Sequence, residues 1–133
     1  MTPAELRART KKFGFDIIKL CRSLPTDWVT RTLGGQLLRA GRPSARITGR
    51  PAVGGLIKSS ARSWAFVAEE ADESLFWLEA IAVDMPRVQT ENYNRLVGEA
   101  DELTAIFTKS YQTSKDNLEK KKREKKNRKS PNH

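Results

Sequence analysis

Apolar residues recur at spacings of three and four along most of the chain, the pattern of amphipathic helices. The first such segment covers about 2–23, where Thr2 followed by Pro3 fits a helix start. Pro25 predicts its end, because a residue before proline avoids the α region. The apolar stripe of this segment consists of Leu6, Phe13, Ile17, Leu20 and Leu24.

The second apolar segment begins at Thr26 or Asp27, either of which can cap a helix. Glycines and Pro43 weaken this helix, and we expect it to continue past Pro43 with a kink. The string GRPAVGG at 49–55 predicts a loop. The stripe of the second segment consists of Val29, Leu33, Leu37, Ala40, Ser44 and Ile47.

The third segment, about 59–83, has two apolar faces instead of one. A helix of this kind either lies centrally among its neighbours or contacts another subunit with its second face. The periodicity leaves both interpretations open, and the candidate oligomer interface consists of Phe66, Trp77 and Ile81. The first face carries Trp64, Val67, Ala68, Ala71, Leu75, Leu78 and Ala82.

The fourth segment begins near Thr90, after the break at Asp84-Met85-Pro86, and its pattern fades after Leu118. Residues 119–133 are polar, low in complexity and strongly basic, so they are expected to be disordered or a fraying helical extension. The predicted fold is therefore all-α: an up-down antiparallel four-helix bundle over 1–118 and a basic tail over 119–133.

The charge of the chain adds a functional indication to this fold. The net charge is +9 over 133 residues and the pI is ≈ 10.0. Such a balance indicates a polyanionic partner, either nucleic acid or an anionic membrane surface, although it also promotes solubility. No apolar run approaches the length of a membrane span and no secretory leader is evident, so we expect a cytoplasmic protein without a membrane partner.

Basic residues form two groups that are candidates for nucleic-acid contact. Spacings of three, four and four place one row on a single helix face, provided that the second helix continues; the row consists of Arg39, Arg42, Arg46 and Arg50. The tail group binds phosphates without base selectivity; it includes Lys120, Lys121, Lys122, Arg123, Lys125 and Lys126. The alternative is a solubilising tail and an arginine face that pairs with the acidic residues of the third segment.

Residues for catalysis or metal binding are sparse. The single histidine is His133, so no Glu-x-x-His pair and no base for a nucleophilic triad exists in the interior. Cys21 lies on the apolar side of its helix and is expected to be a buried thiol. The string GGLIKSS lacks the spacing of a phosphate-binding loop. We therefore expect no metal, no cofactor and no enzymatic activity.

Three blocks of the sequence carry a resemblance to a known family: ELRARTKKFGFDIIKLCRSLP, GGQLLRAG and FVAEEADESLFWLEAI. Together they resemble the four helix bundle family, also called the 23S rRNA intervening-sequence proteins, over roughly 5–111. The resemblance implies a homopentamer. A related branch, the accessory proteins of diversity-generating retroelements, binds nucleic acid and a reverse transcriptase through a basic surface.

The stretch 40–52 departs from the pattern of this family. It reads AGRPSARITGRPA, with additional arginines, Pro51, and Ile47 where the family has an asparagine. The leading hypothesis is a homo-oligomeric nucleic-acid-binding protein, directed to RNA or assisting a reverse transcriptase. The alternative is an oligomeric scaffold for protein partners with no nucleic-acid role.

Overall fold

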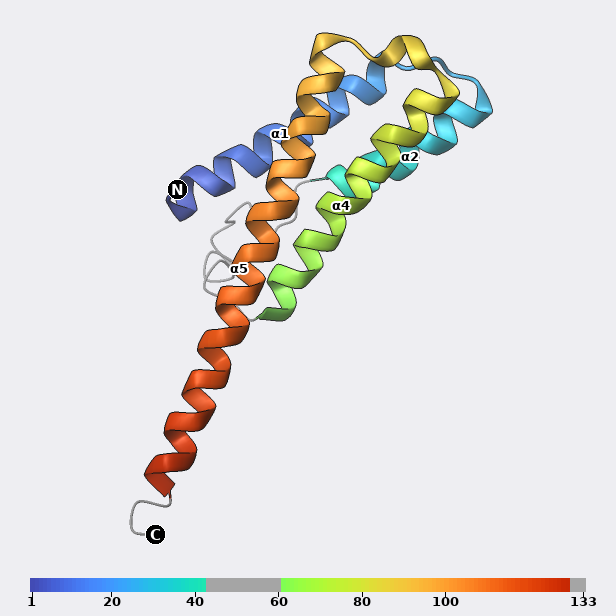
Figure 1. Ribbon diagram of the computed structural model, residues 1–133. Coiled ribbons are helices and arrows are strands. Elements are labelled where there is room, and N and C mark those ends of the chain that lie inside the picture. Colours follow the sequence, from blue (N-terminus) through green and yellow to red (C-terminus); the bar gives the residue numbers. More distant parts are fainter. Residues whose placement is uncertain (43–60, 130–133) are drawn as a thin grey trace.

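The computed structural model describes residues 1–42 and 61–129, and this part of the chain contains four α-helices and no strand (Figure 1). The prediction of an all-α protein is confirmed for these residues. The helices are α1 (Pro3–Ser23), α2 (Trp28–Gly41), α4 (Ala61–Asp84) and α5 (Glu91–Lys129), with a short 3-10 helix, η2 (Pro86–Val88), between the last two. The loop predicted at 49–55 lies outside the described residues.

The starts of the first two helices follow from local capping. Thr2 and Glu5 form a capping box, in which Thr2 Oγ1 accepts from the Glu5 amide at 3.1 Å and Glu5 Oε2 accepts from the Thr2 amide at 3.2 Å. Of the two residues predicted to cap α2, Asp27 does so by accepting from the Thr30 amide at 3.0 Å.

Helix α2 ends at Gly41, which corrects the expectation that it continues through Pro43. Arg42 is the cap residue, with φ −58° and ψ 131°, outside the helical region. The ring of a proline disfavours the α conformation in the residue before it. The same effect ends α1, where Leu24 precedes Pro25 with φ −77° and ψ 149°.

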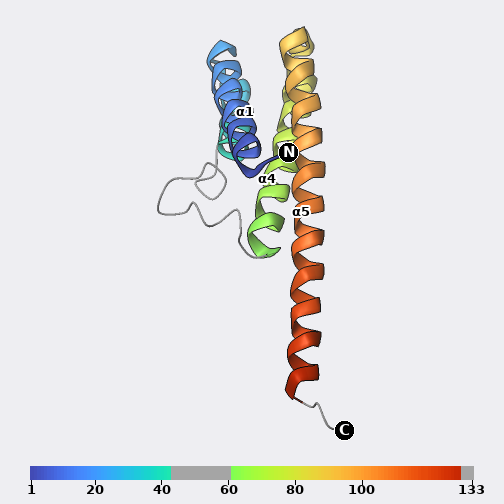
Figure 2. The same cartoon turned by 90° about the vertical axis from the view of Figure 1, so that its left-hand side faces the viewer.

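The helices pack as two neighbouring pairs around one core. In Figure 2, α1 and α2 lie on one side and α4 and α5 on the other. Helix α1 packs against α2 and α5, and α4 packs against the same two helices, so that α1 and α4 lie diagonally. Each helix contributes at least one fully buried apolar side chain; these are Ile17, Leu37, Leu78, Ile81, Leu96 and Leu103.

Ion pairs join α1 to α5 along the edge of this core. Arg9 Nη2 donates to Glu99 Oε1 at 2.6 Å and also pairs with Glu102. Asp16, which is 9% exposed, accepts from Lys12 Nζ at 2.8 Å and from Arg95 Nη2 at 3.2 Å. These contacts attach the first helix to the last.

Helix α5 has a packed half and a projecting half. Its last buried residue is Phe107, and every residue of 115–129 is exposed. Figures 1 and 2 show this end of α5 extending well beyond the other helices. We call residues 115–129 the arm. Of the two states predicted for the tail, the helical extension is the one present, up to Lys129.

Candidate nucleic-acid interface

The arm is helical because its composition and charge order both favour a helix. It contains no glycine or proline and consists mostly of Lys, Glu and Arg, which are good helix formers. Asp116 and Lys120, Glu119 and Arg123, and Glu124 and Arg128 follow one another at a spacing of four, with the acid first. This order favours a helix by about 0.2–0.5 kcal/mol for each pair that forms, and in the structure none of the three pairs is at ion-pair distance. Basic residues in the last turn also suit the negative end of the helix dipole.

The charges of the arm are segregated between two faces of the helix. The arm holds nine basic and three acidic residues. At about 100° per residue, all three acids lie on one side, the mixed face, together with Arg123 and Lys120. The opposite side carries Leu118 and the other cations without any acid, and we call it the basic face. The cations of the basic face are Lys115, Lys121, Lys122, Lys125, Lys126, Arg128 and Lys129.

The basic face continues the side of α5 that is buried in the packed half. Leu103 and Phe107 lie on this side, and continued helical spacing leads through Leu118 to Lys122 and Lys125. Apolar residues thus give way to cations where the neighbouring helices end. A second arm cannot pack on this face as a coiled coil, because like charges would meet at the seam.

The cations of the arm are available for an external partner. Within 1–42 and 61–129, the ion pairs are those of Arg9, Lys12 and Arg95, and none includes a residue of the arm. All six tail cations predicted as contacts are exposed; they are Lys120, Lys121, Lys122, Arg123, Lys125 and Lys126. The structure places four of them on the basic face and Lys120 and Arg123 on the mixed face.

The predicted row of arginines does not continue along α2 beyond Arg39, because this helix ends at Gly41. Arg39 is exposed in the last turn of α2, Arg42 is exposed beyond its end, and Arg46 and Arg50 lie outside the described residues. The end of α2 is also distant from the arm along the axis of α5 (Figures 1 and 2). The described arginines of this row therefore do not extend the basic face.

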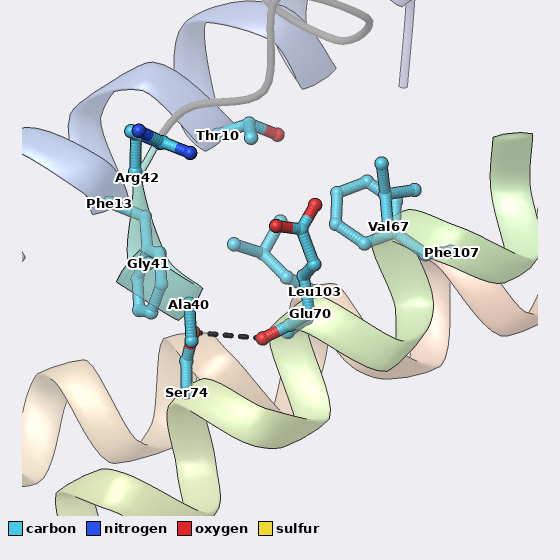
Figure 3. Close-up of a pocket in the computed structure, with 11 residues that line it drawn as sticks. Thr10, Phe13, Ala40, Gly41, Arg42, Val67, Glu70, Ser74, Leu103 and Phe107 are labelled. Carbon is cyan, nitrogen blue, oxygen red and sulfur yellow. Dashed lines mark hydrogen bonds between the residues drawn. The ribbon is translucent and has the colours of Figure 1, made fainter. Parts of the chain in front are cut away.

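Arg42 also lines a small cavity where the four helices meet, with Glu70 of α4 at its opposite wall (Figure 3). The cavity has a volume of about 30 Å³, room for one or two water molecules. Pockets for small-molecule ligands are usually ten times larger or more. Ser74, which is fully buried on the same wall, donates to the Glu70 carbonyl at 3.0 Å. This cavity is a packing feature of the core.

The candidate oligomer interface on α4 requires one correction. Ile81 is 0% exposed and belongs to the core of the single chain, so a second subunit cannot contact it. Trp77 is partly buried, and Phe66 is 45% exposed. Phe76 and Val83 are 58% and 83% exposed and were missed, because the phase of the helix is known only once its core face is identified. They are seven residues apart and hence share a face.

Acidic residues surround these exposed apolar side chains of α4. Glu69, Asp72, Glu73 and Glu79 are exposed, and none of them takes part in an ion pair within the described residues. The alternative expectation, that the arginine row pairs with this acidic face, stays a prediction, because Arg46 and Arg50 lie outside the described residues.

Other chemistry in the described part of the chain is limited. Cys21 is half-buried, and burial raises the pKa of its thiol to about 11, so it stays protonated at neutral pH. Within 1–42 and 61–129, no group of three metal-binding side chains occurs. Among these residues no helix has the length and apolar character needed to span a bilayer.

No protein-family model, curated protein or solved structure matches this chain. The resemblance to the four helix bundle family therefore rests on the three sequence blocks alone.

Proposed function

We propose that this protein is a non-enzymatic, homo-oligomeric nucleic-acid-binding accessory protein of the cytoplasm. Its four helices would form an up-down antiparallel bundle that presents the arm. One observation carries the proposal: an exposed helix of fifteen residues holds nine cations, and an acid-free face collects seven of them. A phosphate backbone is the polyanion that such a regular row of cations matches best.

The proposed mechanism is electrostatic capture of phosphates. Each lysine or arginine that contacts a phosphate releases a condensed counterion, and this release is the source of affinity. Contacts of this kind do not select bases. Several arms in one oligomer would act together, because binding of the first arm raises the effective concentration of the others.

Homo-oligomer formation is supported by two complementary exposed faces. The outer face of α1 is basic and carries exposed Phe15 and Ile18 between Lys11 and Lys19. The outer face of α4 is acidic and carries exposed Phe76 and Val83. Because α1 and α4 lie diagonally, the two faces point away from each other. We propose that they meet between copies, head to tail, which closes into a ring when the rotation between copies allows it.

The finer assignments rest on the family resemblance. It favours a pentamer, and it favours RNA or the complex of a reverse transcriptase as the target. Phosphate contacts alone do not distinguish RNA from DNA.

The test replaces the six predicted tail cations by glutamine in the full chain, which keeps helix propensity and changes no buried residue. In this six-glutamine variant, retention of a labelled RNA hairpin or a duplex DNA at 50 mM salt should fall at least a hundredfold. A second variant, with Arg39 and Arg42 replaced by glutamine, should retain most of the binding. If the wild type and both variants retain the labelled nucleic acid equally, the proposed nucleic-acid function is refuted.

The second candidate function is a scaffold for protein partners. The observation that favours it is the acidic face of α4 with exposed Phe76 and Val83, which in this case would contact a protein partner instead of a second copy of the chain. One assay distinguishes the two functions. The scaffold function predicts that the wild-type chain binds neither RNA nor DNA at low salt, whereas the leading proposal predicts binding that is lost when the salt concentration is raised.

A further inference from the structure

We propose that the basic face of the arm lies in the major groove of double-stranded DNA and contacts the phosphates on both sides of it. This inference rests on the proposed nucleic-acid function and specifies its ligand. It follows from three features of the arm: its shape, the separation of its charges, and the side-chain types that it contains.

The shape of the arm fits a wide groove. The exposed helix of fifteen residues is about 22 Å long and, with side chains, about 10–12 Å across. The major groove of B-form DNA is about 12 Å wide and admits an α-helix. The major groove of A-form RNA is deep and narrow and does not. No other described helix lies beside the arm along its length (Figures 1 and 2). The described helices therefore do not clash with DNA that surrounds the basic face.

The separation of charges defines how the helix is oriented in the groove. Cations on the basic face span an arc of about 160°, so their side chains reach both walls of a groove that encloses that face. Asp116 points out of the groove, and Glu119 and Glu124 lie at the two borders of the mixed face, outside the arc of the basic-face cations. A chain that needed only overall positive charge would have no need of this separation.

The side-chain types argue against unpaired nucleic acid and against base reading. The arm contains no aromatic residue, so it offers no ring for the stacking of unpaired bases. Of its two asparagines, Asn127 lies on the mixed face and Asn117 at the border between the two faces, so neither lies at the centre of the basic face. Binding should therefore prefer duplex over single strands and be independent of sequence.

The decisive experiment exchanges neighbouring residues so that composition and net charge stay constant. Exchange of Glu124 and Lys125 (E124K/K125E) places an acid at the centre of the basic face. This acid stands four residues before Lys129, a spacing that preserves helix stability. The control exchanges Glu119 and Lys120 (E119K/K120E), which leaves the basic face free of acids. Because it also removes the pairs of Asp116 with Lys120 and of Glu119 with Arg123, the two exchanged chains are compared at equal helix content. Affinity for a 20-base-pair duplex DNA is measured at 50 mM salt by fluorescence anisotropy, and far-UV circular dichroism reports the helix content.

The groove proposal predicts that E124K/K125E binds the duplex roughly tenfold more weakly, the effect of about one lost phosphate contact. The control E119K/K120E should bind within about twofold of the wild type. If both exchanged chains bind like the wild type while the six-glutamine variant does not, the arm acts through total charge and the groove proposal fails, although the nucleic-acid function stands. If the six-glutamine variant also binds normally, the nucleic-acid function itself fails.

The choice of ligand is tested with the same wild-type chain. A duplex RNA and a single strand of matching length should each bind at least fivefold more weakly than the duplex DNA. Equal or tighter binding to either probe would overturn the assignment to the DNA major groove.

Discussion

Gly41 is a point of close approach between α2 and α1. A Cβ atom placed on Gly41 would lie 3.0 Å from Cγ1 and 3.1 Å from Cγ2 of Ile17. Ile17 is completely buried, so it has little space to move away. The absence of a side chain at position 41 therefore permits this close contact between the two helices.

Gly41→Ala should lower the free energy of unfolding by about 1–3 kcal/mol, the cost of overpacking a core. Gly35→Ala is the matched control, because a Cβ there meets no atom within 4 Å. It should raise the free energy of unfolding by up to about 1 kcal/mol through better helix propensity. Urea unfolding of the two variants measures both effects, and equal stabilities would contradict the close packing of α1 on α2.

Asp16 makes the stability of the chain depend on pH. Burial alone would raise its pKa, but hydrogen bonds from Lys12 and Arg95 outweigh burial and leave the pKa below its ordinary value. A carboxylate with a lowered pKa stabilises the folded state above its unfolded pKa of about 3.9 and loses this effect as pH falls through the folded value.

Asp16→Asn should therefore unfold about 1 kcal/mol more easily than the wild type at pH 7. The difference should shrink as the pH is lowered from 5 to 3. Asp101→Asn serves as control, since Asp101 is exposed and forms no ion pair in the described part of the chain. A difference that stays constant over this range would show that the ion pairs of Asp16 do not stabilise the fold.

At the scale of the element, the arm is a helix whose stability is limited by its own charge. Lys121 and Lys125, Lys122 and Lys126, and Lys125 and Lys129 are like charges at a spacing of four, which oppose the helix by about 0.2–0.5 kcal/mol each. The face that would bind phosphates is thus the face that destabilises the free helix. Bound phosphates would relieve this repulsion.

Lys125→Glu should stabilise the arm and weaken its binding at the same time. The substitution replaces two repulsive pairs, with Lys121 and Lys129, by attractive ones. Amide hydrogen exchange of residues 119–129 should slow by about two- to fivefold, while affinity for duplex DNA falls. Faster exchange, or slower exchange with unchanged affinity, would break the proposed link between charge repulsion and binding.

The sequence predicts the helices well because their core residues follow regular spacings. It does not predict the end of α2, since apolar positions continue past Arg42 and favour a longer helix, whereas the steric effect of Pro43 ends it. It also cannot decide which stripe of α4 is buried, and Ile81 belongs to the core although it shares a stripe with exposed Phe66. Only packing against α2 and α5 fixes this phase.

The cations of the candidate site are evident from composition, but their arrangement is not. A sequence of Lys, Arg and Glu suits either a disordered tail or a helix, and attachment to a helix anchored by Phe107 favours the helix. Once the helix is present, the separation of its charges into two faces follows from the spacing. The arginine row differs, because Arg39 and Arg42 share a helix face with Arg46 and Arg50 only if α2 continues past Pro43, and α2 ends at Gly41.

At the scale of the whole molecule, the complementary faces of α1 and α4 predict head-to-tail assembly. Light scattering of the wild type should give a mass that is a multiple of 15.0 kDa, about five times for the ring implied by the family resemblance. Phe76→Ser and Ile18→Ser should each lower this mass to that of a monomer. Leu118→Ser is the control, because it changes an exposed apolar residue of the arm and should leave the mass unchanged.

A mixture of the Phe76→Ser and Ile18→Ser chains distinguishes head-to-tail from symmetric pairing. In head-to-tail assembly, each chain keeps the face that the other has lost, so the mixture should form a dimer of the two variants. A mixture that stays monomeric would contradict pairing between α1 and α4. If the wild-type chain is monomeric at all concentrations, the proposed oligomer does not exist.

The most direct test of the arm as a nucleic-acid-binding element is the salt dependence of duplex DNA binding between 50 and 200 mM salt. Seven phosphate contacts on the basic face predict a slope of log affinity against log salt near −6, from about −0.9 per contact. In the six-glutamine variant the slope should fall to about half or less, because three cations of the basic face remain. A wild-type slope near zero, or the same slope in both chains, would contradict the account.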